Sequence, residues 1–129
     1  TLGDPCARVA RGATFDSLEC RFDDLDEALQ AASTTAPRAG AVRQRLAQAT
    51  GQEAQGRARC AGGDAKGAKK ELKRAFKKLG QVRALLAAKS SKTIPGRDAM
   101  KADLDGIRVD LKSLKSAVAC PGGGAAGTV

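Results

Sequence analysis

The sequence contains no His, Trp, Tyr or Asn, and its only aromatic side chains are Phe15, Phe22 and Phe76. Because His is the most common general acid and base, its absence argues against an enzyme. Without Asn the chain has no acceptor for N-glycosylation. It also lacks a glycine-rich phosphate loop, a serine nucleophile motif and the roughly 20-residue apolar run of a membrane span. We therefore expect no catalytic residue, no cofactor and no transmembrane segment.

Acidic side chains cluster in two places, but the clusters do not predict a metal centre. Adjacent positions on a helix point in different directions, so runs of carboxylates rarely converge on one cation. Met100 belongs to a regular apolar stripe and is expected in the core. The two acidic groups are Asp23, Asp24, Asp26 and Glu27, and, more loosely, Asp103, Asp105 and Asp110.

Good helix formers dominate the composition, while the β-branched and aromatic residues that favour strands are scarce. Apolar residues recur at spacings of three and four, which is the period of one helix face. The chain of 129 residues fits a single domain. The sequence therefore predicts an all-α fold.

Capping residues divide the chain into five predicted helices. A short helix begins at Asp4-Pro5 and ends at Gly12. The long helices are predicted from Asp16 to Ser33, from Pro37 to Cys60, from Asp64 to Ser90, and up to Cys120 after the loop that ends at Gly96. The second long helix is rich in Ala and Gly, so it should pack closely, and a kink or break is expected near Gly51.

Short connections make successive long helices antiparallel. We therefore expect an up-down-up-down four-helix bundle with a short N-terminal helix over residues 1–120. Residues 121–129 are predicted to form a flexible, glycine-rich tail or linker. Such a tail is typical either of a module taken from a longer chain or of a disordered terminus.

The antiparallel order brings Cys6, Cys20, Cys60 and Cys120 to the same end of the bundle. A zinc site usually contains ligands in close Cys-x-x-Cys pairs, which are absent here. Disulfides are therefore favoured over a four-thiolate metal site or free thiols. Disulfides imply an oxidising compartment, so the protein is expected to be secreted or periplasmic.

Four cysteines allow three pairings. Cys20 points away from the apolar stripe of its helix, towards a position that the short N-terminal helix can occupy. This geometry favours Cys6–Cys20 with Cys60–Cys120. The second and fourth long helices are diagonal in a square bundle, however, so Cys20–Cys60 with Cys6–Cys120 remains the alternative.

The net charge of +9 is unevenly distributed. Residues 1–35 contain seven acidic and three basic side chains, whereas residues 64–92 contain ten basic and two acidic ones. Three interpretations of the basic face remain open: a solvated surface, a site for polyanions, or a partner of the acidic first long helix, within the bundle or between copies. Its residues are Lys66, Lys69, Lys70, Lys73, Arg74, Lys77 and Lys78.

These features favour a non-catalytic structural or protein-interaction module of a secreted protein, acting as a spacer, an assembly unit or a binding bundle. Its partners would be another protein, further domains of the same chain or a second copy in a homo-oligomer. The alternative is a binder of anionic polymers or surfaces, such as polysaccharide, nucleic acid or anionic membrane, through the lysine-rich helix 64–90.

Overall fold

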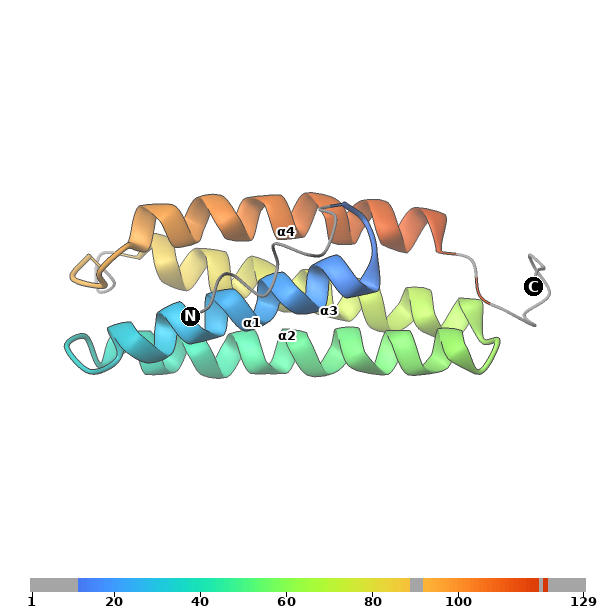
Figure 1. Cartoon of the computed structure of the whole chain (residues 1–129), viewed down its shortest axis with the longest axis horizontal. Helices are drawn as coiled ribbons and strands as arrows, with labels where there is room; N and C mark the ends of the chain where they lie inside the picture. The colour runs from blue at the N-terminus through green and yellow to red at the C-terminus, as the bar shows by residue number, and fades with distance from the viewer. Residues whose placement is uncertain (1–11, 89–91, 119, 121–129) are drawn as a thin grey trace, which may run out of the picture.

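The computed structural model describes residues 12–88, 92–118 and 120 (Figure 1). These residues form four helices and no strand, which confirms the all-α prediction for this part of the chain. The short helix predicted at 4–12, apart from Gly12, and the tail predicted at 121–129 lie outside the described residues. The helices are α1 (Phe15–Ala32), α2 (Arg38–Ala61), α3 (Ala65–Ala87) and α4 (Arg97–Ala117).

The N-terminal boundaries of α1, α3 and α4 are explained by the residues that precede each helix. α1 begins earlier than predicted, because the Thr14 side chain, rather than Asp16, accepts a hydrogen bond from the Ser17 backbone N–H. α3 begins as predicted, with Asp64 accepting from the Gly67 N–H at 2.7 Å. α4 follows Gly96, whose φ of 72° is the left-handed conformation that glycine adopts most easily.

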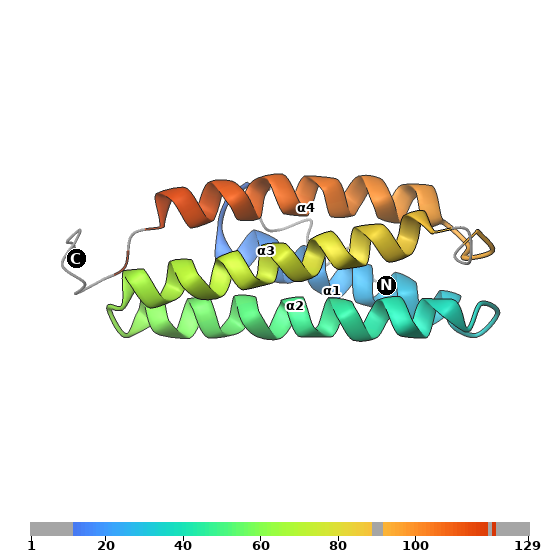
Figure 2. The same ribbon diagram turned by 180° about the vertical axis from the view of Figure 1, so that it is seen from behind.

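The helices lie side by side, and each one packs against two neighbours (Figures 1 and 2). The four interfaces are α1/α2, α2/α3, α3/α4 and α1/α4. Helices α1 and α3 therefore occupy opposite sides of the bundle, as do α2 and α4. The apolar stripes meet in one core, which includes Leu18, Phe22, Leu46, Leu72, Leu79, Leu104, Ile107 and Leu111.

A disulfide joins Cys60 to Cys120 at the end of the bundle that contains the α2–α3 turn, here called the disulfide end. Their Cα atoms are 4.9 Å apart. This bond confirms the favoured partner of each cysteine and excludes the alternative that paired Cys60 with Cys20 and Cys120 with Cys6. Cys6 lies outside the described residues, so the Cys6–Cys20 pair stays a prediction.

The diagonal placement of α2 and α4 does not prevent this disulfide, because Cys120 is not on a helix. α4 ends at Ala117, three residues earlier than predicted, and Val118 continues with extended backbone angles (φ −63°, ψ 128°). The segment after α4 thus carries the cysteine to α2, where Cys60 is 6 % exposed and Cys120 is 1 % exposed.

Cys20 lies further from the disulfide end than predicted. Asp16 and Glu19, in the first turns of α1, pair with Arg57, which is one turn before Cys60 in α2. The first turns of α1 are therefore level with Arg57 rather than with Cys60, so α1 starts short of the C-terminal end of α2.

α2 is unbroken across Gly51, so the break predicted there is wrong. Gly51 is exposed, and a Cβ at this position would meet no atom within 4 Å. Gly51 and Gly56 each destabilise the helix by about 1 kcal/mol relative to alanine. The buried residues on both sides of Gly51, such as Leu46 and Ala49, supply enough packing to keep the helix continuous.

α2 and α3 approach each other closely at Gly56, as expected from a helix rich in small residues. A Cβ built on Gly56 would lie 3.2 Å from Leu72 Cδ2 and 3.3 Å from the Ala68 carbonyl oxygen. The carbonyl belongs to the α3 backbone and cannot easily move, so this position permits the two helices to approach closely.

The two glycines should therefore respond oppositely to alanine. Gly51→Ala is expected to stabilise the fold by about 0.5–1 kcal/mol, because it gains helix propensity in open space. Gly56→Ala is expected to destabilise it by about 1 kcal/mol, because the added methyl presses on α3. Urea unfolding followed by circular dichroism measures both. Equal gains for the two variants would contradict the close α2/α3 approach.

Candidate functional site

The lysines of α3 form a continuous stripe on the side of the helix that faces away from the core. The buried residues Leu72, Ala75 and Leu79 define the inner face of α3. At about 100° per residue, positions four, three and four apart along the outer face fall into line. We call Lys66, Lys69, Lys70, Lys73 and Lys77 the lysine stripe, and all five are exposed.

No lysine of the stripe forms an ion pair with another described residue. Many of the arginines behave differently and are held by carboxylates. Arg83 pairs with Asp105 of α4 at 2.9 Å, and Arg74, the predicted site residue next to the stripe, pairs with Glu71 at 3.3 Å. Lys78 is only half-exposed and lies at the edge of the stripe. The structure therefore groups the predicted lysines on one surface of α3, and it holds Arg74 beside them in an ion pair with Glu71.

Among the described residues, the ion pairs that join α1 to a neighbouring helix through its carboxylates lead to α2 and not to α3, which argues against direct charge pairing of α1 with the basic helix within the bundle. α1 and α3 lie across the bundle from one another. The carboxylates of α1 instead bind arginines of its neighbour α2: Asp26 binds Arg43, and Asp16 and Glu19 both bind Arg57. The hydrogen bond that Arg57 donates to Asp16 raises the pKa of Arg57 above its usual value.

α4 also contributes an ion pair to the acidic side of the bundle. Arg21, which is only 7 % exposed, donates to Asp110 of α4 at 2.7 Å and to the Gly12 carbonyl at 3.1 Å. These contacts engage several carboxylates of α1 and one of α4, whereas the lysine stripe of α3 forms no ion pair with another described residue.

A second group of cations surrounds the α2–α3 turn, at the N-terminal end of the lysine stripe. A cavity of about 330 Å³ is lined there by Arg59, Lys66, Lys70 and Arg74, together with Asp64 and Glu71. Glu71 is 2 % exposed, although it belongs to the most basic helix. It accepts from Arg59 Nε at 3.2 Å and from Arg74 Nη1 at 3.3 Å.

Glu53 is a buried carboxyl group in α2, on the side of that helix that faces the core. Its side chain is 0 % exposed, and neither carboxyl oxygen has a hydrogen-bond partner within normal distance among the described residues. The pKa of Glu53 is raised to about 9, mainly by burial and also by the nearby carboxylate of Glu19, although the positive charge of Arg57 acts in the opposite direction. Glu53 is therefore a neutral acid at pH 7.

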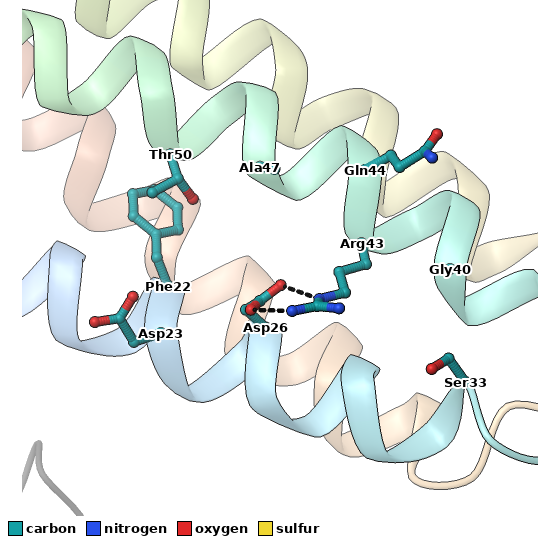
Figure 3. A pocket seen from close by; sticks show the side chains of 9 residues that line it. All are labelled: Phe22, Asp23, Asp26, Ser33, Gly40, Arg43, Gln44, Ala47 and Thr50. Atoms are coloured by element: carbon teal, nitrogen blue, oxygen red, sulfur yellow. Dashed lines mark hydrogen bonds and ion pairs between the residues drawn. The ribbon is translucent and has the colours of Figure 1, made fainter.

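A groove of about 550 Å³ separates parts of α1 and α2 (Figure 3). Arg43 and Asp26 point toward each other across it, and Arg43 donates both Nε and Nη2 to the Asp26 carboxylate. Phe22 and Thr50 lie on one side of this pair, and Ser33 and Gly40 lie on the other. The ion pair engages two of the charged side chains that line the groove, Arg43 and Asp26.

Sequence reasoning missed Glu53, Arg59 and Glu71 as site residues. The two glutamates could have been found, because each occupies a position of the apolar period: Glu53 follows Ala49 by four residues, and Glu71 follows Ala68 by three. Arg59 carries no such signal, since its role depends on the conformation of the turn.

None of the described helices combines the length and hydropathy that crossing a bilayer requires. Within the same residues, His, Cys, Asp and Glu side chains form no group of three or more that could hold a metal ion. Comparisons with protein-family models, curated proteins and solved structures find no match for this chain.

Proposed function

We propose that this chain is a non-catalytic binding module of a secreted or periplasmic protein, and that it holds an anionic polysaccharide along the lysine stripe. The observation that supports this function is the row of exposed lysines without ion-pair partners among the described residues. Like charges three and four residues apart destabilise a helix by a few tenths of a kcal/mol per pair. An external polyanion would convert that repulsion into attraction.

A linear polymer fits the stripe better than a membrane or stacked bases. The apolar face of α3 is buried, with Leu72 and Leu79 both 0 % exposed, so it cannot insert into a bilayer while the bundle is folded. The stripe contains no aromatic side chain for base stacking. Phe76 is half-buried beneath the guanidinium of Arg108, 4.8 Å from the ring centre. From Lys66 to Lys77 the helix offers a charged length of about 16 Å.

The fold and the compartment complete the proposal. We infer an up-down-up-down four-helix bundle that is closed by two disulfides, Cys60–Cys120 and Cys6–Cys20. The Cys60–Cys120 bond is consistent with an oxidising compartment. Acidic polysaccharides are common outside cells, where such a bundle would encounter them.

The stripe is tested by neutralising Lys69, Lys73 and Lys77 together as glutamines. Each lost lysine contact should reduce the slope of log affinity against log salt by about 1, so we expect a decrease of about 2–3. At about 0.1 M salt the affinity should fall at least tenfold. Fluorescence anisotropy with a labelled heparin fragment, measured over a range of NaCl concentrations, gives both quantities.

The matched control neutralises Lys101, Lys112 and Lys115 of α4, which removes the same net charge from another helix. We expect this variant to bind heparin within about threefold of the unmodified chain. If both triple variants lose affinity equally, the attraction is due to net charge alone and the stripe is not a binding site.

The second candidate is a purely structural module, such as a spacer or assembly unit. The Cys60–Cys120 disulfide favours it, because the bond fixes the segment after α4 to the end of α2 and makes that end of the bundle rigid. This function would be preferred if the unmodified chain bound heparin no more strongly than expected for a protein of its charge.

A further inference from the structure

The cavity at the α2–α3 turn has more positive charge than its own carboxylates use. Arg59, Lys66, Lys70 and Arg74 line it, and its volume is about 330 Å³. Lys66 and Lys70 are exposed and form no ion pair with another described residue. The two acidic side chains of the cavity are already engaged, so they do not compete for these ammonium groups.

Glu71 gives the cavity a fixed geometry. Its carboxylate is almost fully buried and accepts one hydrogen bond from Arg59 and one from Arg74. It therefore holds two arginines from different helices beside each other at the mouth of the cavity. Asp64 restrains Arg59 through Nη1 at 3.4 Å, and its other oxygen accepts from the Gly67 N–H.

Most guanidinium N–H donors of Arg59 and Arg74 remain open after these contacts. A guanidinium group has five such donors. In Arg59, Glu71 accepts from Nε and Asp64 accepts from Nη1, and in Arg74, Glu71 accepts from Nη1. Two arginine forks and two lysine ammonium groups around one cavity match the charge and donor requirements of a tetrahedral oxyanion. The Gly67 N–H is not one of these donors, because Asp64 already accepts from it.

We propose that the cavity lined by Arg59, Lys66, Lys70 and Arg74 is a subsite for a single sulfate or phosphate-ester group, with Glu71 positioning the arginines. The inference rests on the proposed function, because the subsite would receive a pendant group of the polymer that lies along the stripe. It narrows the ligand to polysaccharides whose charge comes from sulfate or phosphate esters rather than from carboxylates alone.

The subsite is tested with sodium sulfate added to the ¹⁵N-labelled full chain at constant ionic strength, with NaCl as the balancing salt. We expect saturable NMR shifts at the amides of residues 66–71 and at the Nε groups of Arg59 and Arg74. Lys66→Gln/Lys70→Gln should weaken sulfate binding at least fivefold. The control Lys73→Gln/Lys77→Gln, which removes the same charge further along α3, should change it less than twofold.

Glu71→Gln separates a positioning role from simple attraction. The change makes the cavity more positive, so attraction by net charge alone would strengthen sulfate binding. If Glu71 holds the arginines in place, the affinity should instead fall, and Glu71→Asp should recover part of it. Thermal unfolding identifies any loss of the fold, and the Lys66→Gln/Lys70→Gln pair tests the subsite even if the Glu71 variants do not fold.

Two larger probes distinguish the source of the group: a sulfated oligosaccharide and vesicles that carry phosphate-monoester lipids. Oligosaccharide binding that Lys66→Gln/Lys70→Gln weakens supports the subsite on a polymer. If sulfate binds saturably and the vesicles bind but the oligosaccharide does not, the subsite is supported and the proposal that its ligand is a polysaccharide is overturned. Linear, unsaturated shifts with sulfate overturn the subsite, whereas a stripe that still binds heparin leaves the proposed function standing.

Discussion

Replacing Glu53 by methionine is expected to raise the free energy of unfolding at pH 7 by about 2–3 kcal/mol. Glu53 is completely buried, and its oxygens have no hydrogen-bond partner within normal distance among the described residues. Methionine has a similar unbranched length and carries neither a titratable proton nor a strong hydrogen-bonding group. The substitution should therefore remove the free-energy cost of burying the acid while keeping the volume of the side chain.

The pH dependence of this effect follows from the direction of the shift. The folded chain holds the proton of Glu53 up to a pKa of about 9, whereas the unfolded chain releases it near the ordinary value of 4.5. Between these two values the folded state binds more protons, so the stability of the unmodified chain falls as the pH rises. Above the folded pKa the carboxyl group is ionised in both states, and its contribution becomes constant.

Charged side chains of α1 and α2 also affect the free energy of ionising Glu53. Glu19 and Asp23 of α1 approach Glu53 with negative charge, and Arg57 of α2 is the opposing positive charge. Ionised Glu53 would be repelled by α1, so high pH should weaken the α1/α2 interface first. Hydrogen exchange of the α1 amides at pH 7 and pH 9 would detect this loosening.

Urea unfolding between pH 5 and pH 9 measures the predicted effect. Glu53→Met should abolish most of the decline in stability over this range, and Glu53→Gln should abolish the same decline with a smaller gain, because its buried amide remains unpaired. The control is Glu27→Gln in α1, where the carboxyl group is exposed. A chain that becomes more stable from pH 5 to pH 9 would contradict a buried neutral acid.

The sequence predicts α3 well because several local signals agree there. Asp64 is a good N-cap, the apolar residues follow one helical period, and the lysines occupy the opposite face. The exposure of the lysine stripe follows directly from that period. The absence of ion pairs between the stripe and other described residues does not follow from the period, since it depends on which helices lie next to α3 in the folded bundle.

Residues that act through tertiary contacts were harder to predict. The acidic residues of α1 could have paired with any basic helix, and only the order of the helices around the core directs them to Arg43 and Arg57 of α2. The Cys60–Cys120 bond similarly depends on the extended segment after α4, whose path no periodic pattern specifies. Local pattern thus predicts the helices, whereas loop paths and neighbour relations decide the contacts.

Removing the disulfide with Cys60→Ala/Cys120→Ala is expected to lower the free energy of unfolding by about 2–4 kcal/mol. The bond closes a loop between cysteines 60 residues apart, which strongly restricts the unfolded chain. Urea unfolding without reductant measures the loss. Cys60→Ser/Cys120→Ser should give a loss in the same range, since the effect arises from the cross-link rather than from one replacement side chain.

Removing the disulfide is also expected to affect the two proposed binding sites differently. Arg59 directly precedes Cys60, so losing the bond should loosen the end of α2 that holds Arg59 against Glu71. We expect weaker sulfate binding at the turn, while heparin binding through Lys69, Lys73 and Lys77 changes little at a temperature where both chains are folded.

Mass measurement after alkylation should show Cys60 and Cys120 protected in native material unless reductant is added first. Free alkylation of both thiols without reductant would refute the cross-link and, with it, the oxidising compartment that we infer from it.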